Sequence, residues 1–404
     1  MARKIDSYDV IVVGGGPSGS QVAYKLAGMG YIVGVVEKKA TLNGEVCCTG
    51  LVSRECVDKY SIPAVVIHRW ANGAKLFPPS GKPVHVQRDT PQVAVLNRSA
   101  FNQIWAQRAK KAGAEYRFGC NLKGIIREKG KVTAEVSCRG QALTLQGRAI
   151  VIATGFGTPL LDNLGLGAAG DFVMGAQSVV ETGIDEVEVY FGNQVAPGFF
   201  GWLVPTSPGK GLVGLLARRD NPFYLRKLLA SLAADGKIAS ADVKMNYGGV
   251  PLKPLPHTRG DNLLVVGTSA GQVKPITGGG IYFGLICADI AANSLNRALQ
   301  TDNLSAHALA GYERAWRRKL ARELRNGYWG RKVYEMLNDR QLNRVFGLLE
   351  STGIIEELSR SGELSFDWHA DVIARVMGQK LLAKTLNSIT VPFSRKKMAG
   401  SKIQ

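Results

Sequence analysis

The sequence predicts an α/β fold in which a mostly parallel sheet is interrupted by an antiparallel insertion and followed by helices. Three observations predict it. A strand, a glycine loop, a helix and a second strand follow one another within about 30 residues near the N-terminus, which is the pattern of a βαβ unit. Short strand-like runs separated by turns dominate residues 171–250, and residues from 303 onward are almost wholly helical in pattern.

The first βαβ unit has three parts. Residues 8–13 form a buried-strand pattern, residues 20–27 carry apolar residues at helical spacing, and residues 32–37 predict the next strand. A right-handed crossover is expected for such a unit. The glycine loop between the first strand and the helix therefore lies at the carboxyl edge of a parallel sheet, where ligands bind in this class of fold.

The glycine loop has the spacing Gly14-x-Gly16-x-x-Gly19, and Glu37 ends the second strand 18 residues after Gly19. Glycines allow a tight turn and a close approach of the backbone to a pyrophosphate at a helix N-terminus, while the acidic residue binds ribose hydroxyls. A carboxylate at Glu37 would repel a 2′-phosphate. The sequence therefore predicts a site for FAD or NAD, and the spacing alone does not choose between them.

The remaining elements follow in order. Five prolines make residues 61–96 irregular and short-stranded, and Gly113 ends the next helix. We expect helices at residues 99–112, 221–234 and from about 280, and strands at residues 122–137, 141–146, 149–153 and 262–267. The chain divides on this basis into a discontinuous nucleotide-binding domain (1–60, 97–165 and 255–302), an inserted antiparallel domain (61–96 and 166–254) and a helical C-terminal region (303–404).

Composition sets further limits. The 404 residues are 45% hydrophobic and 21% charged, which excludes wholesale disorder. No run approaches the ~20 apolar residues that cross a bilayer, so we expect a cytoplasmic protein that spans no membrane. The six cysteines lack a secreted disulfide pattern and paired zinc spacing, and we expect four of them in the core: Cys56, Cys120, Cys138 and Cys287.

The net charge of +19 is the outlier of the composition. It divides into +12 for residues 1–150, zero for 151–300 and +7 for 301–404. Solvated basic faces, nucleic acid, an anionic membrane, an acidic protein partner or a phosphorylated ligand would each account for it. No nucleic-acid-binding module is present, so we expect no nucleic-acid partner. The five histidines form no metal-binding spacing, and we expect no metal.

Three later segments complete a known pattern. Ala153-Thr-Gly155 ends a strand, residues 260–271 read GDNLLVVGTSAG, and residues 275–281 read PITGGGI. Together with the glycine loop they resemble the FAD-binding pattern of flavoproteins of the glutathione-reductase and p-hydroxybenzoate-hydroxylase type. Within these, the sequence resembles the geranylgeranyl reductase family, which includes the archaeal digeranylgeranylglycerophospholipid reductases. The resemblance covers about residues 6–300.

The resemblance implies FAD as cofactor. A helix beginning at the Gly278–Gly280 run would direct its dipole at the pyrimidine end of the flavin ring and stabilise negative charge there. Arg98 matches the flavin-contacting arginine of the family, and Leu122 the position whose backbone meets the adenine. The residues expected to bind FAD are Gly14, Gly16, Ser18, Gly19, Glu37, Lys38, Cys47, Cys48, Gly50, Arg98, Leu122, Gly155, Gly267, Thr268, Gly279, Gly280 and Ile281.

Two loops matter for the expected chemistry: one matches the cysteine loop of the family, and the other departs from the family pattern at one residue. Residues 45–51 resemble the family's cysteine-containing loop beside the flavin, and either Cys47 or Cys48 matches its cysteine, as a proton relay or a soft contact. Thr268 stands where the family normally has an aspartate that accepts hydrogen bonds from the ribityl chain. A threonine hydroxyl accepts a weaker bond because it carries no charge.

The aromatic run at residues 200–205 resembles the family's substrate-domain signature. Trp202 and Pro205 are kept, while Phe200 replaces a tyrosine, so a tyrosyl proton donor is lost from this motif. An apolar wall of this kind suits an isoprenoid chain, since burial of each CH2 contributes ~0.8 kcal/mol. We therefore expect substrate contacts at Phe200, Trp202 and Pro205. A core position in the inserted sheet would account equally well for Trp202 alone.

A basic amphipathic helix is predicted in the C-terminal region. Tyr312, Trp316, Leu320, Leu324 and Tyr328 form an apolar stripe at i, i+4 spacing, and six basic residues cover the other faces. The stripe either packs on the protein core or lies at an anionic membrane surface.

The resemblance implies an FAD-dependent reductase that saturates C=C bonds of a polyprenyl group on an isoprenoid lipid by hydride transfer, with Cys47 or Cys48 in the reaction. The electron donor is NADPH or a ferredoxin-like protein, and a peripheral position on an anionic membrane would suit the substrate. A monooxygenase on the same fold, a flavoprotein that relays electrons to a membrane quinone, and a lipid-binding protein without catalysis are the alternatives.

Overall fold

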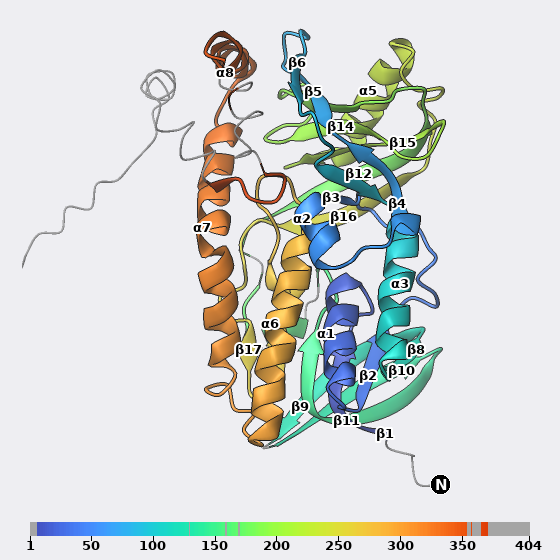
Figure 1. Cartoon of the computed structure of the whole chain (residues 1–404), viewed down its shortest axis with the longest axis vertical. Coiled ribbons are helices and arrows are strands. Elements are labelled where there is room, and N and C mark those ends of the chain that lie inside the picture. The colour runs from blue at the N-terminus through green and yellow to red at the C-terminus, as the bar shows by residue number, and fades with distance from the viewer. Residues whose placement is uncertain are drawn as a thin grey trace, which may run out of the picture.

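The computed structural model describes residues 6–128, 130–157, 160–168, 170–353, 357 and 365–370. In this part of the chain an eight-stranded sheet and a seven-stranded sheet form two stacked parts, and long helices run beside the first (Figure 1). The predicted α/β class, with a parallel sheet, an antiparallel insertion and helices after it, is confirmed. The arrangement places the carboxyl edge of the parallel strands toward the second sheet.

The eight-stranded sheet has the order β17-β18-β11-β1-β2-β8, and β9 and β10 extend it from β11. β1 pairs in parallel with β2 and β11, β2 with β8, and β11 with β18. The strands are β1 (Asp6–Val13), β2 (Val33–Glu37), β8 (Glu115–Phe118), β9 (Cys120–Glu128), β10 (Lys131–Cys138), β11 (Gln141–Ile152), β17 (Arg259–Gly260) and β18 (Leu263–Val265).

Two strand predictions in this sheet are wrong. Residues 122–137 are not one strand, because the chain turns back at Gly130, whose φ is 73°, and β9 pairs with β10. Residues 141–146 and 149–153 are not two strands. Gly147 pairs with Tyr8 of β1 and with Val132 of β10, so β11 continues through it without a break.

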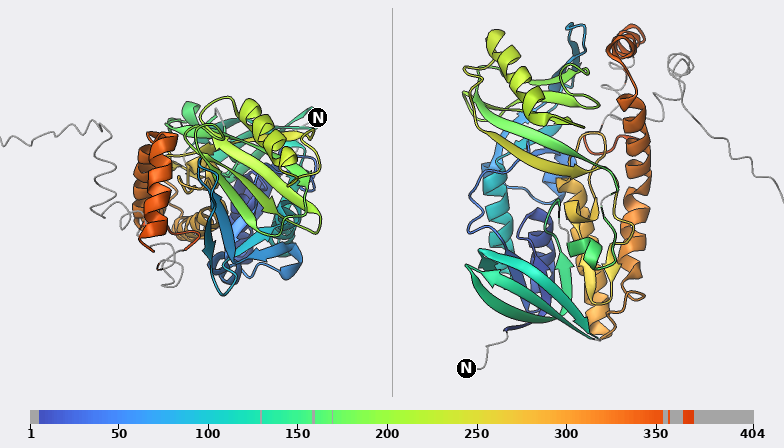
Figure 2. Two further views of the ribbon diagram at one scale, coloured as in Figure 1. Left: turned by 90° about the horizontal axis from the view of Figure 1, so that it is seen from above. Right: turned by 180° about the vertical axis from the view of Figure 1, so that it is seen from behind.

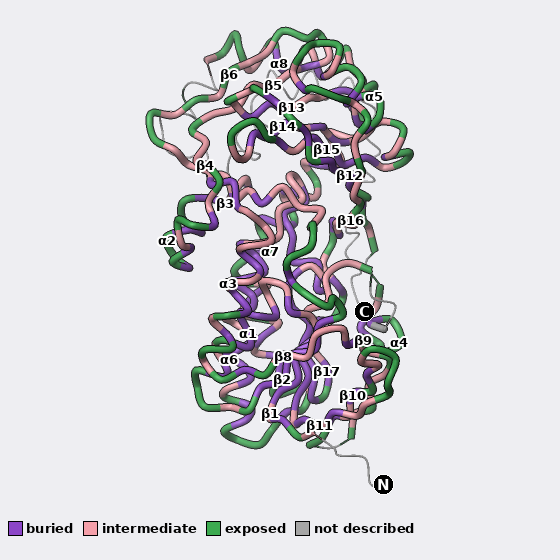
Figure 3. The backbone as a smooth tube through the Cα atoms, turned by 90° about the vertical axis from the view of Figure 1, so that its right-hand side faces the viewer, coloured by how far each residue is buried: buried purple, intermediate pink, exposed green. Residues whose placement is uncertain are grey.

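Four long helices lie against this sheet: α1 (Pro17–Gly28), α3 (Arg98–Lys111), α6 (Ile281–Gln300) and α7 (Ala310–Glu335). Their apolar faces join those of β1, β2, β11 and β18 in one buried cluster that includes Val12, Leu26, Phe283 and Trp316. Figure 3 shows this buried backbone gathered around β1 and β2. The β9–β10 hairpin supplies Val132 and other apolar side chains that pack on the opposite face of the sheet.

The seven-stranded sheet has the order β16-β12-β15-β14-β13-β5-β6, and its neighbours are antiparallel except β13 and β5. α5 (Asn221–Ala234) packs on one face through a cluster with Ala176, Leu203 and Leu215. Figure 2 shows α5 lying across this sheet, away from the long helices. The strands are β5 (Gly73–Phe77), β6 (Val84–Gln87), β12 (Phe172–Glu181), β13 (Val187–Phe191), β14 (Phe200–Pro205), β15 (Lys210–Ala217) and β16 (Met245–Pro251).

A three-stranded sheet joins the two parts, with β7 (Val93–Leu96) between β3 (Leu51–Ser53) and β4 (Ile67–Ala71). The expected domain boundary between residues 60 and 61 runs through this sheet, because β3 precedes the boundary while β4 and β7 follow it. Of the strands in residues 61–96, only β5 and β6 enter the seven-stranded sheet. The domain division therefore stays a prediction. The shorter elements are α2 (Arg54–Lys59), α4 (Leu160–Asn163), α8 (Asp339–Ser351), and the 3-10 helices at Ala64–Val66 and Gly267–Ala270.

The prediction of four core cysteines is confirmed for Cys56, Cys120 and Cys287, which are buried, while Cys138 is half-buried and packs against the core. Cys56 and Cys287 are free thiols. Cys120 and Cys138 form a disulfide. They face each other directly across the β9–β10 pair, which composition and spacing along the sequence did not indicate.

The apolar stripe of α7 packs on the protein core, which decides between the two interpretations of this helix. Tyr312, Trp316 and Leu320 are fully buried, and the Trp316 indole donates a hydrogen bond of 2.9 Å to Thr258 Oγ1. The stripe is therefore not available to a membrane. The basic side of α7 remains exposed at Arg314 and Arg318.

Within the described residues, we find no helix that combines the length and the apolar character needed to cross a membrane.

Packing of α7 on the sheet gives a testable prediction. Trp316→Ala removes a fully buried indole and leaves a cavity, so it should lower the free energy of unfolding by about 3–5 kcal/mol in a urea titration. Arg318→Ala, on the exposed side of the same helix, should change it by less than about 0.5 kcal/mol. Equal, small effects of the two changes would contradict the burial of the stripe.

Candidate active site

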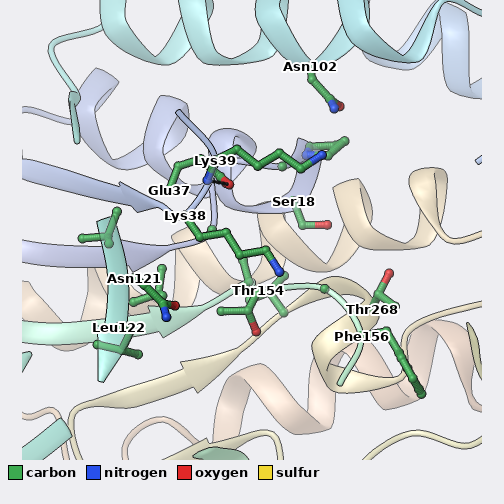
Figure 4. A pocket seen from close by; sticks show the side chains of 18 of the residues that line it. Ser18, Glu37, Lys38, Lys39, Asn102, Asn121, Leu122, Thr154, Phe156 and Thr268 are labelled. Carbon is green, nitrogen blue, oxygen red and sulfur yellow. Dashed lines mark hydrogen bonds between the residues drawn. The ribbon is translucent and has the colours of Figure 1, made fainter. Parts of the chain in front are cut away.

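A cavity of about 590 Å³ lies at the carboxyl edge of the parallel sheet. The ends of β1, β2 and β11 form its floor, and α1, α3 and β9 contribute its walls (Figure 4). Its size is within the usual range of ligand pockets, about 300–1,000 Å³. The carboxyl edge, at the point where β1 has partners on both sides, is the place where doubly wound sheets bind nucleotides.

The glycine loop forms one side of the cavity, and each glycine has a different reason to be there. Gly14 has a φ of 108°, and a Cβ on it would overlap the Ala153 carbonyl. A Cβ on Gly19 would overlap the Gly14 carbonyl. Gly16, which caps α1 and lines the cavity, has no atom within 4 Å of a Cβ position. Gly14 and Gly19 thus serve close packing, and Gly16 keeps space open for a ligand.

Glu37 and the lysines after it border the cavity where β2 ends. The buried Glu37 carboxylate accepts hydrogen bonds from the backbone N–H of Gly15 (2.7 Å) and of Lys39 (2.9 Å). These bonds fix its orientation and leave one lone pair on each oxygen for a hydroxyl donor. Lys38 and Lys39 also line the cavity, and Figure 4 shows both beside Glu37.

Arg98, at the start of α3, lines the cavity with unsatisfied nitrogen atoms. Nε and Nη1 are buried and have no hydrogen-bond partner among the described residues. Asn102, one turn along α3, also lines the cavity, and its buried Oδ1 lacks a partner there too. Buried polar atoms are normally hydrogen-bonded, so these atoms mark positions where a bound ligand would supply hydrogen-bond partners. A Cβ on Gly50 would lie 3.0 Å from the Arg98 stem, so Gly50 gives this side chain its path.

β9 supplies a wall that the sequence only partly predicted. Leu122 lines the cavity as expected, and Asn121 and Lys123 line it beside Leu122. Cys120 lines it as well, so the Cys120–Cys138 disulfide ties this wall to β10. Sequence reasoning missed these neighbours, and Asn102, because only the pairing of β9 with β10 and the packing of α3 bring them to the site.

Gly155 and Thr268 close the far side of the cavity. Ser269 connects their two segments: its Oγ accepts a bond from the Gly155 N–H (2.9 Å) and donates one to the Gly155 carbonyl (3.0 Å). Gly280 lies behind Thr268, since a Cβ on it would be 3.5 Å from Thr268 Oγ1. Gly280 caps α6, which begins at Ile281 as the sequence predicted.

Val46 of the cysteine loop lines the cavity, whereas Cys47 lies against β16 of the seven-stranded sheet and neither Cys47 nor Cys48 lines the cavity. The Cys47 thiol donates to the Asn246 carbonyl at 3.4 Å and would lie 3.5 Å from a Cβ on Gly248. Burial, followed by the neighbouring Cys48, raises the pKa of Cys47 to about 11. The thiol is therefore protonated at neutral pH. Cys48 is half-buried.

The expected substrate residues lie on β14. Trp202 lies opposite Gly214 of β15, and a Cβ on Gly214 would be 2.5 Å from the indole. Phe200 and Trp202 pack into one cluster with Val173, Phe199, Leu216 and Leu252. Pro205 ends β14 and is buried. The buried Trp202 Nε1 has no hydrogen-bond partner among the described residues.

The structure thus brings together nine of the predicted cofactor residues in the cavity wall: Gly14, Gly16, Ser18, Glu37, Lys38, Arg98, Leu122, Gly155 and Thr268. The other predicted cofactor residues do not line it and lie behind its walls or on other elements: Gly19, Cys47, Cys48, Gly50, Gly267, Gly279, Gly280 and Ile281.

These features fit a long nucleotide cofactor. The open position at Gly16 stands at a helix N-terminus, the Glu37 carboxylate is oriented for hydroxyls, and Arg98 and Asn102 offer unsatisfied groups further along the cavity. Cations border the cavity at Lys38, Lys39, Arg98 and Lys123. Within the described residues, no group of three or more acidic, histidine or cysteine side chains could hold a metal ion.

Comparison with solved structures gives the same fold. A geranylgeranyl bacteriochlorophyll reductase-like protein from Thermoplasma acidophilum superimposes with a TM-score of 0.83 at 24% identity, over 95% of this chain and 100% of that chain. A p-nitrophenol 4-monooxygenase from Pseudomonas putida superimposes with a TM-score of 0.71 at 16% identity, over 95% and 99% of the two chains. At these identities the likeness concerns the fold.

Sequence comparison places the chain in a family. A model of the family described as lycopene cyclase protein matches residues 9–389. The digeranylgeranylglycerophospholipid reductase of Methanocaldococcus jannaschii is 30% identical over 84% of this chain and 90% of its own length. The protein of that name from Methanothrix thermoacetophila is 29% identical over 86% and 92%. The chain therefore belongs to the family described as lycopene cyclase protein. Its relatives also place it in the geranylgeranyl reductase family, which its motifs predicted.

Proposed function

We propose that this protein is an FAD-dependent reductase that saturates C=C bonds of a polyprenyl group on an isoprenoid lipid. One observation carries the proposal: a cavity with the features of a dinucleotide site lies beside an uncharged, largely apolar face of the second sheet. The relatives named digeranylgeranylglycerophospholipid reductase support an isoprenoid lipid as the substrate class.

Different residues of the cavity would bind different parts of FAD. The α1 N-terminus at Gly16 would bind the pyrophosphate, Glu37 the ribose hydroxyls, and Arg98 and Asn102 the flavin half. Thr268 would accept one hydrogen bond where the family has a carboxylate. When bound and reduced, FAD would supply the hydride that the alkene carbon accepts.

The apolar face is built by the strand register. Gly175 lies opposite both Gly248 of β16 and Leu216 of β15, while Gln177 lies opposite Gly214, which in turn lies opposite Trp202. Opposed residues of a sheet point to the same face. Leu216 lies over Gly175, and Trp202 over Gly214, so these side chains cover the glycines and make the face apolar. A prenyl chain would lie against it.

Short contacts connect the cavity with the second sheet. Phe156 lines the cavity and packs on the opposite face of β16, since a Cβ on Gly249, which points away from the Gly248 side, would overlap its ring. Gly278, in the loop that leads into α6, approaches the apolar face itself, since a Cβ on it would lie 2.9 Å from Leu216. A ring held at the inner end of the cavity would thus be close to a chain on the face.

The Cys47 loop lies at the β16 end of the same face, and Trp202 lies three strands away on β14. At ~4.8 Å per strand the two are about 14 Å apart, a span that suits a long chain. Because burial keeps the Cys47 thiol protonated, this residue would act as a proton donor or a neutral contact and not as a nucleophile.

The location is part of the same proposal. We expect a cytoplasmic protein in which the exposed basic side of α7, at Arg314, Arg318 and Arg325, approaches an anionic membrane surface or an acidic electron donor. NADPH and a ferredoxin-like protein remain the two candidate donors.

The proposal predicts a change in lipid mass. Geranylgeranyl lipids incubated with the chemically reduced protein should gain mass in steps of two hydrogens per double bond, as measured by mass spectrometry. Unchanged lipids across prenyl substrates would reject a reductase. NADPH-dependent oxygen consumption that rises with substrate would indicate the monooxygenase, and reoxidation by quinone without lipid reduction would indicate the electron relay.

The glycine loop predicts different outcomes for two similar changes. Gly16→Ala adds a methyl group to open space, so it should keep the thermal stability of the apoprotein and raise the FAD dissociation constant by about tenfold or more. Gly19→Ala places a methyl group on the Gly14 carbonyl and should lower the melting temperature as well. Flavin fluorescence titration and apoprotein melting separate the two; unchanged FAD binding in Gly16→Ala would contradict the proposed pyrophosphate seat.

The raised pKa of Cys47 predicts slow alkylation. The thiolate is the reactive form, and with a pKa of about 11 its fraction should rise about tenfold per pH unit through the neutral and mildly alkaline range. Iodoacetamide labelling of residue 47, followed by peptide mass spectrometry, should show that rise. Labelling that levels off below about pH 9 would contradict the burial of this thiol.

A further inference from the structure

The segment 365–370 connects elements that are far apart in the sequence. The Trp368 indole donates to the Glu55 carboxylate at 2.9 Å, and its ring lies 5.3 Å from that of Phe283 on α6. The Glu323 carboxylate of α7 accepts the backbone N–H of Ala370 at 2.8 Å. The segment therefore contacts α2, α6 and α7 at once, next to the loop between Gly267–Ala270 and α6.

A buried ion pair anchors the segment to that loop. Lys274 Nζ donates to Asp367 Oδ1 at 2.6 Å and to the Phe366 carbonyl at 2.9 Å. The side chains of Lys274 and Asp367 are 3% and 2% exposed. The other Asp367 oxygen accepts the Ser53 N–H at 3.2 Å. Both charged groups are thus fully inside the protein.

Lys274 also fixes the glycine loop in front of it. Its N–H donates to the Gly279 carbonyl at 3.0 Å, and its carbonyl accepts the Gly278 N–H at 2.9 Å. Its side chain lies directly against Gly279, since a Cβ there would be 2.8 Å from Lys274 Cε and 3.2 Å from Nζ. Lys274 therefore does two things: its backbone holds the shape of the loop, and its side chain places a buried cation against Gly279.

Stability alone does not account for this pair. Burying two charges costs several kcal/mol per ion, and apolar replacements of a buried pair are often as stable or more so. A charge buried directly behind Gly279 acts instead on whatever lies in front of the loop, because the low dielectric of the interior strengthens its field.

We propose that Lys274 and Asp367 are positioning residues for the bound flavin, with segment 365–370 as the latch that holds them. This inference rests on the proposed function and on the expectation from the sequence that the flavin's pyrimidine end faces the Gly278–Gly280 loop and the N-terminus of α6. Lys274 fixes the loop and places a positive charge behind it, and Asp367 balances that charge. The pair thereby sets the reduction potential of the flavin as well as its affinity.

The proposal predicts opposite shifts for the two charges. Asp367→Asn leaves the cation unbalanced and should raise the midpoint potential of bound FAD, because the reduced ring carries negative charge that the cation stabilises. Lys274→Met leaves the carboxylate and should lower the potential. The double variant should return toward the wild-type value. Lys75→Met, which removes the partner of Glu186 from a half-exposed pair at 3.1 Å, should leave the potential unchanged.

The test is a dye-equilibrated potential measurement on each holoprotein, with the FAD dissociation constant and the melting temperature of the apoprotein measured alongside. Shifts of opposite sign that cancel in the double variant support the proposal. Shifts of the same sign, or none, overturn it, because a purely structural pair would loosen the loop in either variant without regard to charge.

A further variant keeps the inference testable if either charge change prevents folding. Trp368→Ala loosens the segment and leaves both charges in place, so it should raise the FAD dissociation constant. An unchanged constant in a folded Trp368→Ala protein would overturn the latch. A wild-type protein that does not bind FAD would overturn the proposed function together with this inference, whereas FAD-bound wild type with unmoved variants overturns this inference alone.

Discussion

The structure depends on one close approach of backbone to backbone, where the turn after β1 meets the end of β11. Gly14 lies against the Ala153 carbonyl, and Gly19 lies against the Gly14 carbonyl, at distances that no side chain would permit. This contact lets α1 begin directly over the sheet, with its N-terminal N–H groups and its dipole directed at the cavity. The positions of Glu37, on the neighbouring strand, and of Gly155, just past β11, follow from it.

The charges around the cavity are consistent with this geometry. Glu37 is already oriented by two backbone N–H groups, and the side chains near it are cationic, including Lys38 and Lys39. An anionic nucleotide entering here meets favourable potential and gains bonds without breaking any. Part of the positive charge of residues 1–150 therefore belongs to the cavity rim. The neutral stretch 151–300 contains most of the apolar face on which a lipid chain would lie.

Local patterns were sufficient to predict the first βαβ unit, the helices at 99–112, 221–234 and from 280, and the edge of the sheet at which the cavity lies, because each has glycine signals or periodicity within one segment. The sequence was not sufficient where long-range pairing decides. Cys120 and Cys138 meet because β9 pairs with β10 in register. Asn102 joins the site through the packing of α3. The stripe of α7 is compatible with lipid and with core until the sheet beneath it is known, and Lys274 meets Asp367 across 93 residues.

The long-range contacts around the loop before α6 show what a neutral side chain at position 268 changes in the local electrostatics. The loop before α6 has two sides: Thr268 Oγ1 lies close to Gly280 on the cavity side, and Lys274 Nζ lies close to Gly279 on the buried side. A carboxylate at position 268 would place a second negative charge near this loop, where the buried Asp367 already balances the Lys274 cation. With threonine there, the field at the α6 N-terminus comes from the helix dipole and the Lys274–Asp367 pair. The departure that the resemblance implies at Thr268 would therefore make segment 365–370 more important for the electrostatics of a flavin bound here, because a carboxylate charge in the cavity wall is missing from this chain.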